Sequence, residues 1–312
     1  MECEPSPLWI ERRGFVSNKP RKMTLEKKHN LTGWAFLAPA TFLLVVFSFW
    51  PMIKALVLSF QTGKGRNMQM AGFTNYIRMF QDDVFIQSIK NTFFYFIIQV
   101  PIMLLVALVL ACILNKKDLR FKGFFRTMIF LPCTTSLVAY SIIFRSLFAN
   151  DGLVNYVLVN VGILDRPYNF LTQPFAAKMV IILGLLWRWT GYNMVFFLSG
   201  LQNIEYSVYE AAKIDGASAI QTFFKITVPL LKPTILLTAI MSTNGTLQLF
   251  DESINLTDGG PANASISMSH YIYNLCFKYV PNFGYAAAMS FFILLLVAVL
   301  AFMQMRVGDK RD

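Results

Sequence analysis

The stretch EAAKIDGASAIQTFFKITVPLLKP, residues 210–233, is a polar segment that lies between two long apolar segments of the chain. Its second half repeats apolar side chains at i, i+3, i+4 and i+8, at Ile220, Phe223, Phe224 and Val228. This spacing is typical of an amphipathic helix at a surface, and Gly216 is typical of the residue that ends a preceding helix. The stretch therefore predicts two short helices joined at residues 215–217 and an exposed docking surface. The alternative is a connecting loop whose helical pattern is accidental.

The predicted turn combines small and acidic side chains, namely Ala211, Ala212, Ala217, Glu210 and Asp215. The small side chains let the backbone of another protein approach closely, and the acidic ones can pair with basic groups on it. Two prolines, Pro229 and Pro233, stand where the next helix is expected to begin, a position at which a missing N–H costs little.

Composition places the whole chain in a membrane. Of its 312 residues, 55% are hydrophobic and only 14% are charged, which is far more apolar than a soluble domain. Apolar runs of about 20 residues are long enough to cross a membrane as helices. We predict six such spans, near residues 33–60, 89–114, 127–148, 175–198, 234–250 and 285–305. The third is the weakest because Pro132, Ser136 and Arg145 dilute it.

The net charge of +11 is explained by membrane topology rather than by nucleic-acid binding. Basic residues gather before the first span and in the loop after the second, at Arg12, Arg13, Lys19, Arg21, Lys22, Lys27, Lys28, Lys116, Lys117, Arg120, Lys122 and Arg126. The positive-inside rule then predicts cytoplasmic N- and C-termini and a cytoplasmic loop at residues 201–232. Residues 1–30 are expected to form a basic cytoplasmic tail without the apolar core of a cleavable signal peptide, and residues 31–312 the transmembrane domain.

Signs of enzyme chemistry are missing from the sequence. The two histidines, His29 and His270, lie far apart, and the cysteines have no metal-ligand or redox spacing. Residues 63–65, Gly-Lys-Gly, lack the remainder of a phosphate-binding loop. We expect no catalytic residue, metal or cofactor on this chain, so that any energy from ATP must come through a partner.

Polar residues within the last spans predict a path for a hydrophilic solute. Asn244, Gln248, Asp251 and Glu252 follow helical spacing and are expected on one face of the fifth span, where contact with lipid would be costly. Arg188, Tyr192 and Asn193 form a second polar interruption in the fourth span. Aromatic rings beside hydrogen-bonding groups suit a sugar. Helix packing, aromatic anchoring at the interface, or an ion pair of Arg188 with Asp251 or Glu252 are the structural alternatives.

The 210–233 stretch also resembles a known family. Glu210-Ala211-Ala212, Asp215-Gly216-Ala217, Phe223, Ile226 and Pro229-Leu230 reproduce the EAA loop of permease subunits of binding-protein-dependent ABC importers. The segment from Phe250-Asp251 to Gly260-Pro261 and the block WRWTGYNMVFFLSGLQNI are similar to the oligosaccharide and glycerol-phosphate branch. The resemblance covers roughly residues 31–307.

The resemblance implies an all-α permease with six transmembrane helices in a bacterial cytoplasmic membrane, whose coupling helix spans residues 210–217 between spans 4 and 5. Its partners would be a second homologous permease, two ATP-binding subunits that hold ATP and Mg²⁺, and an extracytoplasmic solute-binding protein. By this analogy Glu210 faces a basic residue of the ATPase. The solute would be a di- or oligosaccharide or a related polyol, imported by alternating access around a polar site.

Three alternatives remain at this point. A permease of the same family could carry a glycerol-phosphate-type solute. An ion-coupled secondary transporter would need an acidic group deeper in the membrane than Asp251 and Glu252 are expected to lie. A receptor or assembly scaffold would use the polar helix faces for packing alone.

Overall fold

The computed structural model describes residues 24–64, 67–116 and 118–308. Most of the predicted basic tail, Cys3, Gly65 and the last basic residues of the chain lie outside these ranges. The chain divides into two units, Met1–Ile53 and Lys54–Asp312. The first unit contains α1 (Leu25–Leu44) and the π-helical segment η1 (Val45–Phe49), which continue into α2 (Trp50–Ser59). Within its own unit α1 leaves its described side chains exposed, as suits a helix whose apolar surface is covered by lipid or by another chain.

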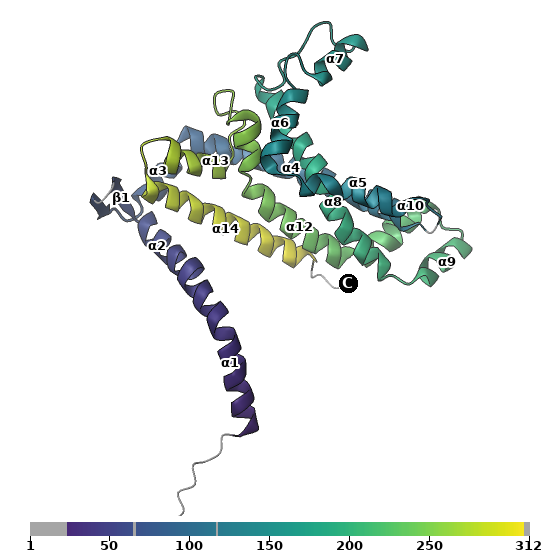
Figure 1. Ribbon diagram of the computed structural model, residues 1–312, viewed down its shortest axis with the longest axis horizontal. Coiled ribbons are helices and arrows are strands. Elements are labelled where there is room, and N and C mark those ends of the chain that lie inside the picture. The colour runs from purple at the N-terminus through teal and green to yellow at the C-terminus, as the bar shows by residue number, and fades with distance from the viewer. Residues whose placement is uncertain (1–23, 65–66, 117, 309–312) are drawn as a thin grey trace, which may run out of the picture. The chain divides into compact units, whose positions relative to one another are not determined.

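The second unit is a bundle in which α4 (Asp83–Asn115) packs most extensively against α8 (Pro174–Gln202), while α12 (Lys232–Leu247) lies beside α14 (Phe283–Gly308) (Figure 1). Together with the Leu25–Ser59 helix, α4, α8 and α14 are long and apolar enough to cross a membrane. Among the described residues these are four candidate spans, or up to six if each of two bent helix pairs counts as one.

The third predicted span is wrong as a single helix. It consists of α5 (Lys122–Thr134) and α6 (Leu137–Leu147), which meet at an angle of 97°. Two threonine hydroxyls near the break donate to backbone carbonyls of the last turn of α5, Thr134 to Leu131 and Thr135 to Pro132. These bonds satisfy groups that a continuing helix would have paired, so the helix ends here at little cost.

The fifth predicted span also ends earlier than expected, at Leu247 rather than residue 250. Gln248 caps α12, and the buried Leu249 then offers its carbonyl to the hydroxyl of Ser267, which belongs to a later loop. Asn244 therefore lies in α12 and Gln248 at its C-cap, whereas Asp251 and Glu252 lie beyond the end of this helix. The expectation of one continuous polar face over these four residues is wrong, because the chain leaves the helix after Leu247 and the Leu249 carbonyl is satisfied by a distant residue.

The prediction of an all-α chain misses a short antiparallel hairpin of β1 (Gln61–Lys64) and β2 (Asn67–Met70) after α2. The side-chain amide of Asn75, in α3 (Thr74–Met79), donates to the carbonyls of Ser59 and Gln61 and holds the start of the hairpin. Gly284 at the beginning of α14 contacts the same Gln61 carbonyl so closely that a Cβ would overlap it.

Helix α4 contributes to three clusters of buried side chains, through Phe85, Tyr95 and Ala107 in turn. Its N-terminus is fixed by Asp82, whose carboxylate accepts from the backbone N–H groups of Val84 and Phe85. The other oxygen of Asp82 accepts from the hydroxyls of Tyr271 and Tyr285, both at 2.7 Å. One carboxylate thus connects α4 with α13 (Met268–Tyr273) and α14.

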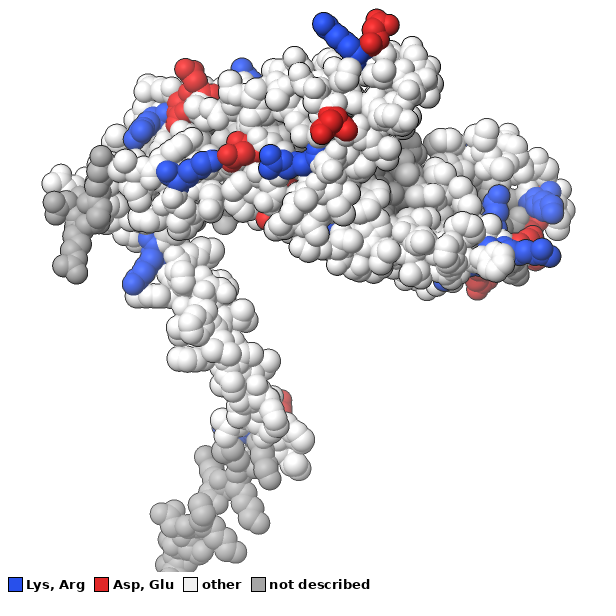
Figure 2. Space-filling view, turned by 45° about the horizontal axis from the view of Figure 1, so that its top comes forward, with Lys and Arg blue, Asp and Glu red and all other residues white. Residues whose placement is uncertain are grey.

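Two further regions complete the second unit. Between α6 and α8 the chain forms α7 (Leu153–Asn160), and its Asn155 amide donates to the carbonyls of Ala149 and Tyr168. Between α8 and α12 it forms α9 (Tyr206–Ile214), α10 (Ala219–Thr222), η2 (Phe223–Thr227) and α11 (Val228–Leu230). In Figure 2 charged side chains gather at the end of the unit where α9 and α10 lie.

Candidate functional site

The predicted helix–turn–helix is present, and its turn is built as expected. Helix α9 ends in a left-handed Gly216, with φ of 73°. The Gly216 N–H donates to the Lys213 carbonyl and the Ala217 N–H to the Ala212 carbonyl, which is the hydrogen-bond pattern of a Schellman motif. Ser218 then begins α10 with a capping box, in which its hydroxyl and backbone N–H bond reciprocally to Gln221. We call residues 206–222 the α9–α10 hairpin.

The hairpin exposes most of its apolar side chains. Ile214 is 86% exposed, Ile220 is 71% exposed, and Ala212 is the buried residue of α9. Glu210, Ala211 and Asp215 are exposed as well, and Ala217 is half-buried. Exposed large apolar side chains on two short, well-capped helices are typical of a surface that binds another protein.

The remaining predicted docking residues divide between that surface and the bundle. Phe223 is half-buried and packs on the cluster around Leu198 and Leu231, whereas Phe224 is 62% exposed. Pro229 is exposed in the first turn of α11, within the bent helix that leads to α12. Pro233 stands in the first turn of α12, as predicted.

A second feature is a cavity of about 330 Å³ among α4, α8, α12 and the segment that follows α12. Its volume lies at the lower end of the roughly 300–1,000 Å³ typical of small-molecule sites. Five of the predicted path residues line it, namely Tyr192, Asn193, Gln248, Asp251 and Glu252. Trp189 and Phe250 add aromatic surface. The break after Gln248 brings Asp251 and Glu252 to the same cavity as Gln248 without a shared helix.

Asn244 does not line this cavity. It lines a neighbouring one of about 570 Å³, mainly against α14, and Gln248 borders both. The Gln248 amide donates to the Asn244 side chain, and both residues are exposed within the isolated chain. Asn244 and Gln248 are therefore neighbours that share one cavity, and of the two it is Gln248 that also borders the cavity containing the other path residues.

Arg188 is also outside the lining of the cavity. It is 6% exposed, and its guanidinium donates to the carbonyl of Thr135 at 2.8 Å and lies over the ring of Tyr140. No ion pair with Asp251 or Glu252 occurs among the described residues. Arg188 instead supplies a charged donor to the break between α5 and α6, so its position is explained by the fold.

Sequence reasoning missed the part of the lining that comes from α4 and the middle of α12. The Thr246 hydroxyl donates to the side-chain carbonyl of Gln99 at 2.8 Å, and the Ser242 hydroxyl to that of Asn193 at 3.3 Å. Asn193 thereby joins α8 to α12, as the packing alternative expects. Gln99 is a polar residue in the middle of an apolar span, a signal that could have drawn attention to it.

Two path residues keep free polar groups. The hydroxyl of Tyr192 and the carboxylate of Asp251 have no hydrogen bond or ion pair within the described ranges. The Tyr192 ring is held edge-on by Trp189 and Phe196, at centroid distances of 5.8 and 5.1 Å. An aromatic face with unoccupied hydroxyl and carboxylate groups beside it can bind a polyhydroxylated molecule.

The family described as "Binding-protein-dependent transport system inner membrane component" matches residues 85–311, which include the α9–α10 hairpin and the lining of the cavity. The chain belongs to this family. It is therefore a permease subunit of a transport system in the inner membrane, and it is not a catalytic subunit.

Relatives of this permease subunit align along nearly the whole chain. The lactose transport system permease protein LacF of Rhizobium radiobacter is 51% identical over 292 residues, 93% of this chain and 98% of that protein. The arabinooligosaccharides transport system permease protein AraP of Bacillus subtilis is 31% identical, covering 89% and 88% of the two chains. The sn-glycerol-3-phosphate transport system permease protein UgpA of Agrobacterium fabrum is 30% identical, covering 89% and 94%.

Two solved structures share the fold of this permease subunit. Chains of a bacterial transporter that imports the acidic polysaccharide alginate align with a TM-score of 0.80 over 91% of this chain and 96% of theirs. In one of these structures, whose chain is 25% identical, the transporter is in complex with a periplasmic protein that holds an alginate pentasaccharide.

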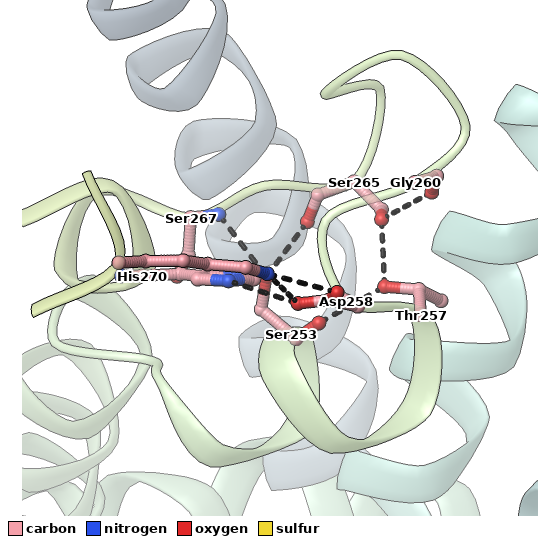
Figure 3. A network of polar contacts seen from close by, with 8 residues as sticks. Ser253, Thr257, Asp258, Gly260, Ser265, Ser267 and His270 are labelled. Carbon is pink, nitrogen blue, oxygen red and sulfur yellow. Dashed lines mark hydrogen bonds and ion pairs between the residues drawn. The ribbon is translucent and has the colours of Figure 1, made fainter. Parts of the chain in front are cut away.

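A polar network holds the segment that carries Asp251 and Glu252 (Figure 3). Ser253 begins the π-helical segment η3 (Ser253–Thr257), and its hydroxyl lies 2.9 Å from Nδ1 of the buried His270. Asp258 lies 3.7 Å from the other ring nitrogen and accepts two hydrogen bonds of 2.9 Å from the Lys278 ammonium. The ion pair at the surface and the buried imidazole together fix η3 against α13. Asp258 also raises the pKa of Lys278.

We expect this permease subunit to lose stability as the pH falls from about 6.5 towards 4. Burial lowers the pKa of His270 to about 4, although the charge of Asp258 acts in the opposite direction and that of Lys278 in the same one. The unfolded chain therefore binds a proton at His270 before the folded one does, and stability is lost across this window, by roughly 1–3 kcal/mol. His270→Gln should remove this dependence. Thermal unfolding at pH 7 and pH 5 measures it, and equal losses in both proteins would contradict it.

Proposed function

We propose that this chain is one permease subunit of an ATP-driven importer that carries a di- or oligosaccharide inward across a bacterial cytoplasmic membrane. The relatives named for lactose and arabinooligosaccharide transport support a sugar as the solute. The observation that carries the proposal is the α9–α10 hairpin, which leaves Ile214 and Ile220 uncovered between the long helix α8 and α12.

The proposed topology has six spans with both termini in the cytoplasm. The first span is the Leu25–Ser59 helix, the broken pair of α5 and α6 is the third, and the bent pair that ends in α12 contains the fifth. The concentration of basic residues before the first span and after α4 supports this orientation. It places the α9–α10 hairpin on the cytoplasmic side, where ATP-binding subunits are available.

The proposed coupling element is the α9–α10 hairpin, and its partners are two ATP-binding subunits that hold ATP and Mg²⁺. Ile214 and Ile220 would enter a hollow of one ATPase subunit, and Glu210 would face a basic group there. The Schellman turn and the capping box make the hairpin stiff enough to transmit a displacement into α8 and α12. A second homologous permease would complete the transmembrane part and bring its own coupling element.

The proposed solute path passes the cavity lined by Tyr192, Gln248 and Asp251. Closure and opening of the two permeases around this site would expose it to each side in turn. A solute-binding protein would deliver the sugar from the extracytoplasmic side, in the way that the alginate transporter is seen in complex with its periplasmic protein.

A glycerol-phosphate-type solute is the second candidate, supported by the relative named for sn-glycerol-3-phosphate transport. The charge of the cavity lining disfavours an anionic solute. Its charged lining residues are Asp251 and Glu252, and the nearby Arg188 donates to backbone carbonyls outside it. The same pair of acidic residues lies beyond the end of α12, which gives an ion-coupled transporter no acidic group within that span.

Affinity purification of the tagged chain from its native membrane tests the proposal. We expect a second permease and an ATP-binding subunit to co-purify. Ile214→Asp should reduce the recovered ATPase at least tenfold without reducing the second permease, because a buried charge without a partner weakens a docked surface. Ile163→Asp is the matched control, since Ile163 is 66% exposed in the loop between α7 and α8. Recovery of neither partner with the unaltered chain would contradict the function.

A further inference from the structure

A cavity of about 500 Å³ lies between the end of α4 and the α9–α10 hairpin, away from the proposed solute path. We call it the α4–α9 cavity. Its lining combines Val109 and Ile113 of α4, the basic residues Lys116 and Lys213, and Tyr209 of α9. A larger hollow of about 730 Å³ adjoins it and shares Lys116 and Tyr209. Neither space is used by the proposed function.

Three side chains of α4 form a strip along this cavity that is apolar at one end and basic at the other. Val109, Ile113 and Lys116 are spaced at i, i+4 and i+7, so they lie on one face of the helix. Val109 is 40% exposed and Ile113 is 42% exposed, and Lys116 follows at the end of the helix. An apolar strip that ends in a cation is complementary to the acyl chain and the phosphate of a phospholipid.

Three polar groups of the cavity lack a hydrogen-bond or ion-pair partner among the described residues. The hydroxyl of Tyr209 is buried without a hydrogen bond to any described residue. Neither Lys116 nor Lys213 forms an ion pair in the part of the chain that the structure describes. A buried hydroxyl without a partner is costly, and two cations that line one cavity repel each other. A phosphate oxygen would accept from the hydroxyl and would neutralise both ammonium groups.

We propose that the α4–α9 cavity binds the head group of an anionic phospholipid, whose acyl chain lies along Val109 and Ile113. The inference rests on the proposed placement of the α9–α10 hairpin at the cytoplasmic face, because only there does the membrane surface reach the cavity. Basic pockets at this surface attract anionic head groups. The lipid would join the end of α4 to α9. Helix α9 has one buried residue, Ala212, so it makes few contacts of its own with the bundle.

Native mass spectrometry of the assembled importer from nanodiscs with equal amounts of phosphatidylglycerol and phosphatidylcholine tests this proposal. The unaltered protein should retain phosphatidylglycerol at least tenfold over phosphatidylcholine. Lys116→Gln and Lys213→Gln should each lower that preference about fivefold. Tyr209→Phe, which removes one hydroxyl and preserves the ring, should lower it severalfold.

Lys225→Gln is the matched control, because Lys225 is an exposed cation just after α10 and does not line the cavity. A loss of preference in this variant equal to that in Lys213→Gln would overturn the proposal in favour of general surface charge. Displacement of the lipid by inorganic phosphate or by an acidic peptide at equal concentration would overturn it in favour of those ligands. Lipid retention requires no transport, so a selective site in an inactive importer would contradict the proposed function alone.

Discussion

Gly216→Val should abolish solute-stimulated ATP hydrolysis by the assembled importer while the chain remains inserted in the membrane. Gly216 has φ of 73°, and a side chain with a branched Cβ is strongly disfavoured there, by about 1–2 kcal/mol or more. The free space around Gly216 means that the strain comes from the backbone alone. Relief of that strain would undo the two hydrogen bonds of the Schellman turn and reorient α10 relative to α9.

Gly216→Asn is the matched variant, because asparagine tolerates the left-handed conformation. It should keep most of the stimulated activity. Gly123→Ala gives a second comparison, since Gly123 has equal free space but lies within α5 without a positive φ. Stimulated hydrolysis by Gly216→Val at the level of Gly216→Asn would show that the geometry of this turn has no part in coupling.

Gln248→Leu should lower sugar uptake at least tenfold while the ATPase stays bound. Gln248 borders the cavity that contains Tyr192 and Asp251, and leucine offers a sugar no hydrogen bond. Loss of a hydrogen bond that a site makes to its substrate is among the larger effects on recognition.

Asn244→Leu separates the two roles that Gln248 could have. Asn244 lies one turn earlier on α12, is bonded to Gln248, and lines the neighbouring cavity instead. A role in packing predicts equal effects of both substitutions, because each breaks the same hydrogen bond. A role in the solute path predicts the larger loss for Gln248→Leu, and uptake by both variants at the normal rate would exclude these residues from the path.

The α9–α10 hairpin could be predicted from sequence because its signals are local. Gly216 and the spacing of the apolar side chains, on which the prediction rests, lie within one short segment, and the capping box of Ser218 and Gln221 that the structure adds is local as well. The four long helices could be predicted for a similar reason, since apolar length alone indicates a span.

The cavity could be predicted only in part, because its shape depends on contacts between distant segments. Ser267 binds the chain just after the end of α12, and the break between α5 and α6 gains a donor from Arg188 of α8. The sequence suggested Asp251 or Glu252 as the partner of Arg188. In the fold its guanidinium donates to backbone carbonyls instead, and such partners cannot be recognised from residue types. Gln99 reaches the cavity only because α4 packs against α12.

Uptake of labelled sugar into vesicles that contain the purified importer tests the central claim most directly. The vesicles hold ATP and Mg²⁺ on the side of the ATP-binding subunits, and the solute-binding protein is added on the other side. We predict uptake that needs both ATP and the binding protein and that stops when either is removed. Uptake that follows a proton or sodium gradient without ATP, or the absence of uptake with every component present, would contradict the account.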